Sequence, residues 1–330
     1  MKKRGKVFIL VGPTAVGKNT LGAKIEKEIK NFTRMPTATT REKRPGEVNG
    51  KDKYFLTNEE FDNLIEKNDF VEWQWVHGNK YGVLKSVIEE RINSGLDFYA
   101  DVEILGALKI KEIYKDDAVL IFVLPPSFEE LKSRIDSREA ETEKEKGLRL
   151  KRSRAEMTYL TEGDCFVLND ELEIAVEDLK KIIDNFQKGG KYDLFRNISV
   201  KAKVLLKTPE GFLLKKEDKE KKLPEINIKN SKFPHEAIKE EFAREWKTDL
   251  KINKSEETKE NKGINLFQPF WVEINAEDKK NCEVVFYYYA FCDDTEKFSS
   301  DFCSLSKKEL KSVLDEEIGS IFGLPDINLI

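Results

Sequence analysis

The sequence predicts an α/β fold, a parallel sheet covered by helices, followed by a smaller α+β domain. Short apolar segments alternate with segments of helical spacing through the first half of the chain, and a glycine-rich segment, Gly12 to Lys18, joins the first strand to the first helix. The alternation ends at a polar stretch, after which the pattern changes. Strands that alternate with helices form parallel sheets, and a chain of 330 residues fits two domains. We therefore expect one domain over 1–187, a linker over 188–194 and a second domain over 195–330.

The elements of the first domain follow from the spacing of apolar residues. Residues 7–11 are wholly apolar and rich in β-branched side chains, which is typical of a buried strand. Leu21, Ile25 and Ile29 are four apart and would share one face of a helix. The same criteria predict further strands at 98–102, 118–124 and 165–168, and helices at 18–30, 59–67, 85–94, 128–136 and 171–186.

Two stretches of the first domain lack such a pattern. Residues 37–52 are polar, rich in turn formers and carry no long period. Residues 138–154 are almost wholly charged, which predicts a solvated helix or a mobile segment.

The second domain shows a different pattern of predicted strands and helices. Residues 198–206 and 211–215 predict a hairpin around a Pro-Glu-Gly turn. A helix over 234–247, an aromatic-rich strand over 283–291 and a helix over 307–316 are also expected.

Composition excludes several classes of protein. With 39% apolar and 36% charged residues, the chain has the make-up of a soluble protein. A net charge of −4 gives no general reason to expect nucleic acid or a membrane as a partner. The four cysteines show no metal-type spacing, and no apolar run has the length of a membrane span or a secretory signal. A cytoplasmic location is expected, and no oligomeric state is predicted.

The glycine-rich segment carries a phosphate-binding signal. Between a strand and a helix, its glycines let successive backbone N–H groups turn toward phosphate oxygens, and the helix adds its positive N-terminal end. Lys18 would place a charge between the β- and γ-phosphates. Asn19 stands where a Ser or Thr commonly contacts Mg²⁺. A turn that binds no ligand is the alternative interpretation. The predicted phosphate-binding residues are Gly12, Pro13, Thr14, Ala15, Val16, Gly17, Lys18, Asn19 and Thr20.

The residues after this loop resemble the guanylate kinase family. The matching motifs, in the family's order and spacing, are Thr37-Ala38-Thr39-Thr40-Arg41, Arg44-Pro45-Gly46-Glu47, Glu72-Trp73, Tyr81-Gly82, Asp101, Gly106 and Asn169-Asp170. The resemblance covers about residues 5–186. It implies a P-loop nucleoside monophosphate kinase fold, with ATP and GMP as nucleotide partners and ATP and Mg²⁺ as cofactors.

The resemblance also implies a role for individual residues. Arg41, Arg44 and Tyr81 would bind the phosphate of GMP, because guanidinium groups suit a phosphate dianion. Glu72 would accept the N–H donors of guanine, and the Thr37 hydroxyl would serve its O6. Asp101 and Glu103 complete the GMP-binding set. Asn169 matches a residue near the adenine of ATP. The catalytic residues would be Lys18 and the lid arginines Arg134, Arg138 and Arg149.

Several positions depart from the family pattern around the GMP site. Lys53 stands in place of a phosphate-binding tyrosine, Val83 in place of a Ser or Thr, Glu103 in place of an Asp and Leu105 in place of a Gln. Such changes could weaken catalysis or shift the acceptor nucleotide. A catalytically weakened nucleotide-binding or interaction module is therefore the alternative to an active kinase. Arg152 and Arg154 are expected to be solvated helix charges.

Residues 195–330 resemble a degenerate Nudix domain. The predicted hairpin and the following helix are similar to that family's opening strands and metal-binding helix. Glu241 and Glu245 would occupy metal-ligand positions, four apart on one helical face. Arg244 stands where the family has a third acidic ligand and would repel Mg²⁺. An ordinary amphipathic helix is the alternative. His77 and His235 are expected to be structural.

Overall fold

The computed structural model describes most of the chain, and the contacts within it form two compact units. The described residues are 3–76, 78–137, 142–192, 198–208, 211–217, 220–229, 233–246, 250–252, 269, 271–278, 281–291 and 302–305. One unit contains Met1–Pro125 and Glu162–Asp193, and the other contains Pro126–Thr161 and Leu194–Ile330. Residues 126–161 thus group with the C-terminal region by compactness, although the sequence assigns them to the first domain. The domain boundaries predicted from sequence remain a prediction.

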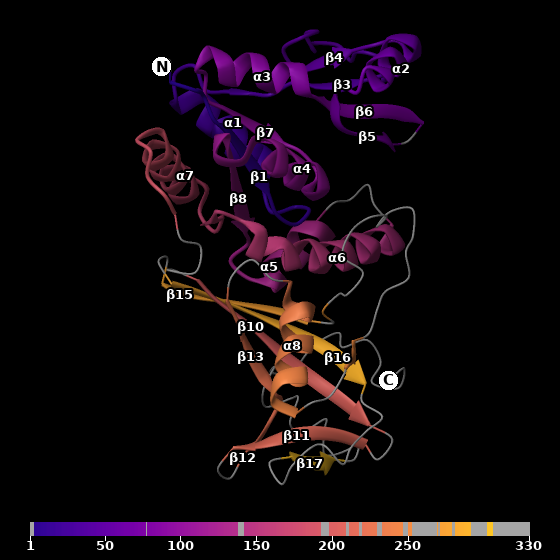
Figure 1. Cartoon of the computed structure of the whole chain (residues 1–330), viewed down its shortest axis with the longest axis vertical. Coiled ribbons are helices and arrows are strands. Elements are labelled where there is room, and N and C mark those ends of the chain that lie inside the picture. Colours follow the sequence, from indigo (N-terminus) through magenta and orange to yellow (C-terminus); the bar gives the residue numbers. More distant parts are fainter. Residues whose placement is uncertain are drawn as a thin grey trace. The chain divides into compact units, whose positions relative to one another are not determined.

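The first unit is built on a five-stranded parallel sheet (Figure 1). Its strand order is β2 (Thr33–Arg34), β7 (Phe98–Asp101), β1 (Val7–Val11), β8 (Ala118–Leu124) and β9 (Cys165–Leu168). All four neighbouring pairs are parallel, and every residue of β1 and β8 is buried. Strands covered on both faces need apolar residues at every position, which explains their continuous hydrophobic runs. The predicted parallel sheet is confirmed.

Helices cover this sheet; those at 18–28, 58–66, 85–94 and 172–187 agree with the predicted ones, whereas the helix at 104–114 was not predicted. Helix α1 packs beside α7 and against β1, and α4 packs against β1 and β8. A short 3-10 turn, η1 (Lys115–Asp117), leads into β8. The helices of this unit are α1 (Lys18–Glu28), α2 (Asn58–Glu66), α3 (Lys85–Ser94), α4 (Ile104–Tyr114) and α7 (Leu172–Gln187).

A second, four-stranded sheet was not predicted. Its order is β4 (Lys53–Phe55), β3 (Thr37–Thr39), β6 (Asn79–Leu84) and β5 (Phe70–Val76). Two of these strands have only three residues, too few to show a period of two against the polar background. Helix α2 covers one face, where Phe61 stacks on Phe70 with ring centroids 4.4 Å apart. The opposite face carries the polar residues discussed below.

The described part of the second unit contains three α-helices and a mixed sheet. Helices α5 (Phe128–Asp136) and α6 (Glu143–Met157) are N-capped by Ser127 and Thr142, and η2 (Thr158–Glu162) follows α6. The charged stretch that the sequence left as a helix or a mobile segment is therefore largely helical. Within this charged run, a capping box formed by Thr142 and Glu145 defines where α6 begins.

The C-terminal sheet has eight strands in the described part of the chain. The predicted hairpin is present as β10 (Ile198–Thr208) and β11 (Gly211–Glu217), and β10 pairs in parallel with β16 (Asn281–Phe291). Helix α8 (Pro234–Trp246) buries Ile238 and Phe242. The helix expected at 307–316 lies outside the described residues. The remaining strands are β12 (Glu220–Lys222), β13 (Glu225–Ile228), β14 (Lys251–Ile252), β15 (Trp271–Asp278) and β17 (Phe302–Leu305).

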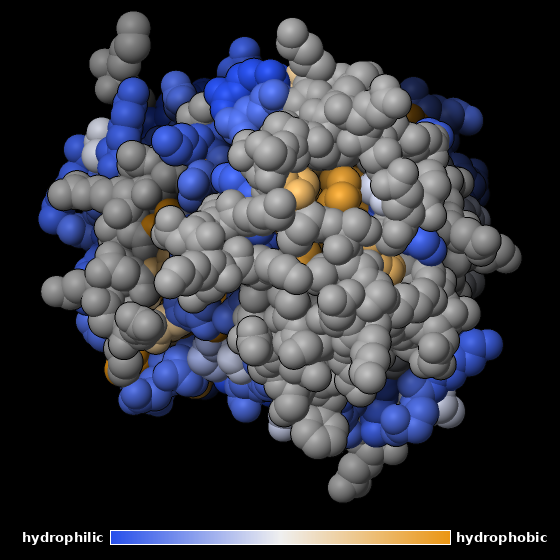
Figure 2. Space-filling view, turned by 90° about the horizontal axis from the view of Figure 1, so that it is seen from below, coloured by the Kyte–Doolittle hydropathy of each residue, from blue (hydrophilic) through white to orange (hydrophobic). Residues whose placement is uncertain are grey.

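Polar residues are the more common of the described residues on the face drawn in Figure 2. Among the coloured residues in this view, hydrophilic ones predominate and hydrophobic ones form only small patches. Within the described ranges, the helices are too short or too polar to cross a bilayer.

Candidate functional site

The glycine-rich loop adopts a tightly curled backbone between β1 and α1. Gly12 and Gly17 have φ values of 140° and 96°, a region that L side chains rarely adopt. A Cβ at Gly12 would lie 2.4 Å from the Val123 carbonyl oxygen on β8. Gly17 is the N-cap of α1, so the loop ends at the positive end of that helix. The curl that phosphate binding requires is thus built into the loop, and Lys18 follows it as the first residue of α1.

Two side chains hold the loop in this shape. The Lys18 ammonium donates to the carbonyl oxygens of Gly12 at 2.7 Å and Pro13 at 3.1 Å, which keeps its charge over the curl. The buried Asn169 amide donates to the Val16 carbonyl oxygen at 2.7 Å. A Cβ at Gly17 would lie 2.5 Å from that same amide nitrogen. Asn169, predicted from the resemblance to lie near adenine, therefore also supports the phosphate loop directly. Asn19 and Thr20 are exposed on the first turn of α1.

One face of the four-stranded sheet gathers most of the residues predicted for GMP. Thr37 pairs with Lys53, and Glu72 pairs with Val83. In the antiparallel pair of β3 and β6, Ala38 pairs with Gly82 and Thr39 with Tyr81. Continuing this register by one residue places Thr37 opposite Val83. Residues directly opposite on neighbouring strands point to the same face. The face therefore carries a row formed by Lys53, Thr37, Val83 and Glu72, which we call the acceptor row.

Tyr81 lies on the same face as the acceptor row. It is two residues before Val83 on β6, and the Lys53 ammonium lies 5.6 Å from the centre of its ring. The Phe70 ring lies on the opposite face, since a Cβ at Gly82 would lie 2.5 Å from it. Alternation along β5 and β6 thus separates a polar face from the face covered by α2.

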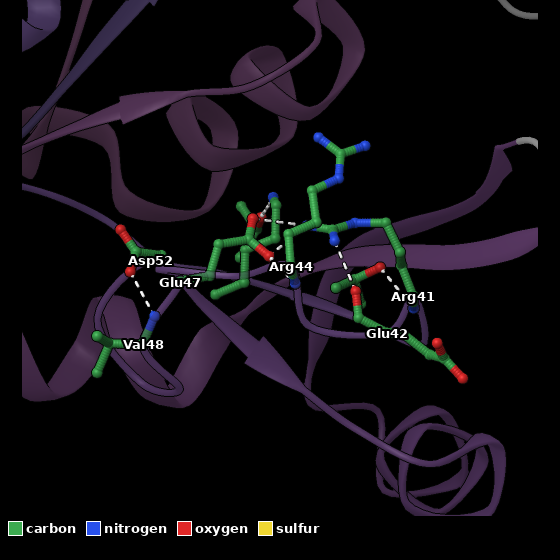
Figure 3. Close-up of polar contacts among 9 residues, drawn as sticks. Arg41, Glu42, Arg44, Glu47, Val48 and Asp52 are labelled. Carbon is green, nitrogen blue, oxygen red and sulfur yellow. Dashed lines mark hydrogen bonds and ion pairs between the residues drawn. The ribbon is translucent and has the colours of Figure 1, made fainter.

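Arg41 is held in place before any ligand binds. Its guanidinium bonds both carboxylate oxygens of Glu47, at 2.7 and 3.0 Å, and the Glu42 carbonyl oxygen at 2.6 Å (Figure 3). The hydrogen bond with Glu47 raises the pKa of Arg41 and lowers that of Glu47. These bonds fix the position of the guanidinium, and a phosphate that binds Arg41 has to share it with Glu47.

Arg44 contributes differently. Its backbone N–H donates to Glu47 at 2.7 Å, and its side chain extends away from that carboxylate into solvent (Figure 3). An exposed guanidinium at this position can approach an incoming anion from solvent.

A second ion pair borders this region. Arg34 on β2 donates to Asp101 at the end of β7, at 2.7 Å. Asp101 was predicted for the GMP site, whereas Arg34 was not, because its position carries no motif. Glu103 is the N-cap of α4 and is exposed, and Leu105 is half-buried in the first turn.

Glu72 has the most perturbed carboxylate of the site. Burial raises its pKa from 4.5 to about 7, and nearby Glu103 raises it further while Lys109 opposes the change. Its carboxylate lies against Gly106, in the first turn of α4. Val83, the paired residue in the acceptor row, is buried and offers no hydrogen bond. A buried carboxylate with a hydrophobic neighbour is well suited to a ligand that brings its own N–H donors.

Two of the three arginines predicted for a lid are described, Arg134 on α5 and Arg149 on α6. Arg134 donates to Glu130 at 2.9 Å, one turn earlier, and Arg149 is half-buried on α6. Arg138 lies outside the described residues, as does His77.

The expectation that Arg152 and Arg154 are solvated charges is wrong for Arg154. Its side chain is largely buried, with the guanidinium 5.8 Å from the centre of the Phe128 ring, and burial lowers its pKa. Helical spacing places it on the face of α6 that packs against α5, which charge content alone did not indicate. Arg152 is partly buried as well and donates to Glu156 at 2.9 Å.

The two glutamates of the second unit that were predicted to bind a metal ion contact an arginine. The Arg244 guanidinium bonds the Glu241 carboxylate and lies 3.4 Å from that of Glu245. Within the described ranges, no group of three or more His, Cys, Asp or Glu side chains is placed to hold a metal ion. His235 is buried, and burial lowers its pKa to about 4.

Comparison with known proteins agrees with this geometry. The family model described as guanylate kinase matches residues 4–186, more than half of the chain. The chain belongs to the guanylate kinase family. It is 39% identical over 180 residues to a guanylate kinase of Thermotoga maritima, covering 54% of this chain and 86% of that protein.

Two solved structures are also similar to this chain. A guanylate kinase from Anaplasma phagocytophilum is 29% identical, with 57% of this chain and 88% of that chain covered and a TM-score of 0.43. A hydrolase of the Nudix family from Clostridium perfringens is 18% identical, with 34% and 84% covered and a TM-score of 0.29.

Proposed function

We propose that this protein transfers the γ-phosphoryl group of ATP to GMP, forming ADP and GDP. The observation that carries the proposal is the acceptor row, in which Thr37 and Glu72 lie on one face with a single strand between them. Strands are about 4.8 Å apart, so these side chains start roughly 10 Å from one another. Their polar ends can meet the edge of a purine between them, with O6 at one end and the N1 and N2 donors at the other.

The phosphate of GMP would bind beside this row. Arg41 is oriented by Glu47, the Arg44 side chain is free to approach from solvent, and the Tyr81 hydroxyl is on the same face. Asp101 and Glu103, at the junction of β7 and α4, would contact the rest of the nucleotide.

ATP would bind at the Gly12–Lys18 loop. Glycines that leave room for close backbone approach and a lysine held over the curl fit a triphosphate. The bound Mg²⁺ would neutralise charge on the transferring phosphoryl group. Asn19 and Thr20 directly follow Lys18 and are the residues proposed to approach this ion. Asn19 offers an amide oxygen where a Ser or Thr would offer a hydroxyl.

Catalysis would rest on position and charge. Phosphoryl transfer spreads negative charge over three oxygens, and the protein need supply no covalent intermediate. Lys18 and the arginines Arg134, Arg138 and Arg149 are the cations proposed to stabilise that charge.

A coupled assay of ADP release across the common nucleoside monophosphates tests the proposal. We expect turnover that is fastest with GMP and that is abolished in Lys18→Met. Folded protein that turns over none of them would refute the kinase. Calorimetry then identifies the alternative, a module that binds GMP without phosphorylating it.

A further inference from the structure

Lys53 replaces the tyrosine of the family pattern, and its ammonium has one close partner. The Lys53 Nζ donates to the Thr37 hydroxyl oxygen at 2.8 Å, from the neighbouring strand of the same sheet. The ammonium also lies over the Tyr81 ring. Among the described residues, the hydrogen bond to Thr37 is its sole polar contact at this distance.

The charge of Lys53 is not neutralised by the acids around it. Burial lowers the pKa of Lys53, and the charges of Arg34 and Arg41 lower it further. The two nearby carboxylates are already paired, Asp101 with Arg34 and Glu47 with Arg41. Three cations thus share two anions, and the excess positive charge lies at Lys53.

This charge determines what Thr37 can do. An ammonium has three donors and no acceptor, so the Thr37 oxygen must accept and its own hydrogen points elsewhere. A ligand group beside Thr37 therefore meets an O–H donor with a positive charge about one hydrogen-bond length behind it. A carbonyl oxygen is attracted by both groups. An amino group would direct its positive hydrogens toward the ammonium, which is unfavourable in a partly buried site.

We propose that Lys53 is a specificity-determining residue, which acts through Thr37 to favour 6-oxopurine monophosphates over 6-aminopurine monophosphates. The inference rests on the proposed function, because it takes Thr37 as the contact to position 6 of the acceptor base. It adds a residue outside the motifs that match the family, at a position where this chain departs from them.

The test compares three acceptors in the full-length protein. IMP and AMP both lack the 2-amino group; they differ at position 6 and at N1, where only IMP carries a hydrogen that Glu72 would accept. Glu72 is present in the wild type and in the variants alike, so the change in the IMP-to-AMP ratio between them reports the contact at position 6. In Lys53→Met we expect the IMP-to-AMP ratio of kcat/KM to fall at least 10-fold, with the KM for ATP unchanged. Lys51→Met, a nearby exposed lysine, should leave the ratio unaltered. Thr37→Ala should lower the ratio similarly, and the double variant should lower it no further.

Two results would overturn the proposal. An equal loss for GMP, IMP and AMP in Lys53→Met would make the residue a phosphate contact instead. Additive losses in the double variant would separate Lys53 from Thr37. If Lys53→Met fails to fold, Lys53→Gln keeps a donor without the charge and should still reduce the ratio. If the wild type turns over no monophosphate, the kinase proposal fails, and dissociation constants for the same three nucleotides still test Lys53.

Discussion

The Glu72 carboxylate lies directly against Gly106, so that a Cβ at Gly106 would be 1.9 Å from Oε1 of Glu72. The glycine is in the first turn of α4, and the glutamate is on β5. A glycine in the first turn of the helix lets a buried carboxylate approach the helix backbone. The match of Gly106 to the family pattern therefore has a physical reason in this chain.

We expect Gly106→Ala to displace Glu72. The added methyl group cannot fit, so the carboxylate must swing away and the KM for GMP should rise by 10-fold or more. The KM for ATP should stay within twofold, because the phosphate loop is elsewhere in the unit. Steady-state kinetics with each nucleotide varied in turn measures both. Gly147→Ala on α6 is the control: no atom lies within 4 Å of its added Cβ, and the helix should gain about 0.5–1 kcal/mol. A normal KM for GMP in Gly106→Ala would contradict the role of this contact.

GMP binding should depend on pH through Glu72. Guanine N–H donors need the ionised carboxylate, whereas burial raises the pKa of Glu72 to about 7 in the free protein. Affinity should therefore rise as pH increases from 6 to 8, by up to about tenfold per unit below the pKa, and then level off. The GMP phosphate titrates in the same range, so Glu72→Gln is the reference that retains only the phosphate effect. Identical pH profiles for the two proteins would exclude Glu72 as the titrating group.

The same shift affects stability in the opposite direction. Because the folded-state pKa of Glu72 is above its ordinary value of 4.5, the protonated carboxyl stabilises the fold below that value. This contribution is lost as pH rises through about 7. Unfolding by urea at pH 5 and pH 8 should show a smaller difference for Glu72→Gln than for the wild type.

Asn169→Ala should impair ATP use selectively. The variant leaves the Val16 carbonyl oxygen without its buried donor, at a cost of about 1–3 kcal/mol. The phosphate loop should then hold its curled conformation less firmly, which raises the KM for ATP about tenfold. The KM for GMP should stay nearly unchanged. Asn169→Asp also removes the donor and adds a charge near the loop, so its effect on ATP should be larger. Equal effects on both nucleotides would indicate general destabilisation.

Replacement of Glu241 and Glu245 by Gln should leave metal affinity unchanged. Both carboxylates already face Arg244, which occupies the position of a further ligand. Calorimetry with Mg²⁺ and Mn²⁺ on the full-length protein compares the two forms, and a nucleoside diphosphate hydrolysis assay checks activity. The helix should lose only about 0.2–0.5 kcal/mol, as is typical of exposed ion pairs on helices. A loss of metal binding in the double variant would restore the Nudix-type interpretation of α8.

Local patterns were sufficient where one interaction dominates. The apolar runs of β1 and β8 predicted buried strands, because a strand covered on both faces has no polar positions to obscure the signal. The loop from Gly12 to Lys18 was predicted because its curled backbone needs glycines at fixed positions, which can be recognised in the sequence. In the sheet of β3, β4, β5 and β6, the first two strands have only three residues each, too few to show a pattern, whereas β5 and β6 were missed despite having seven and six.

The sequence alone determined the family and the parallel sheet, and it proposed the residues for ATP and GMP, since all of these depend on motifs and patterns read along the chain. Only the tertiary structure decided how those residues act on one another. In the folded protein the Lys53 ammonium donates to Thr37, the Glu72 carboxylate lies against Gly106, and the Arg154 guanidinium lies over the Phe128 ring. These contacts arise from strand register and helix packing, which bring together residues that no spacing in the sequence relates.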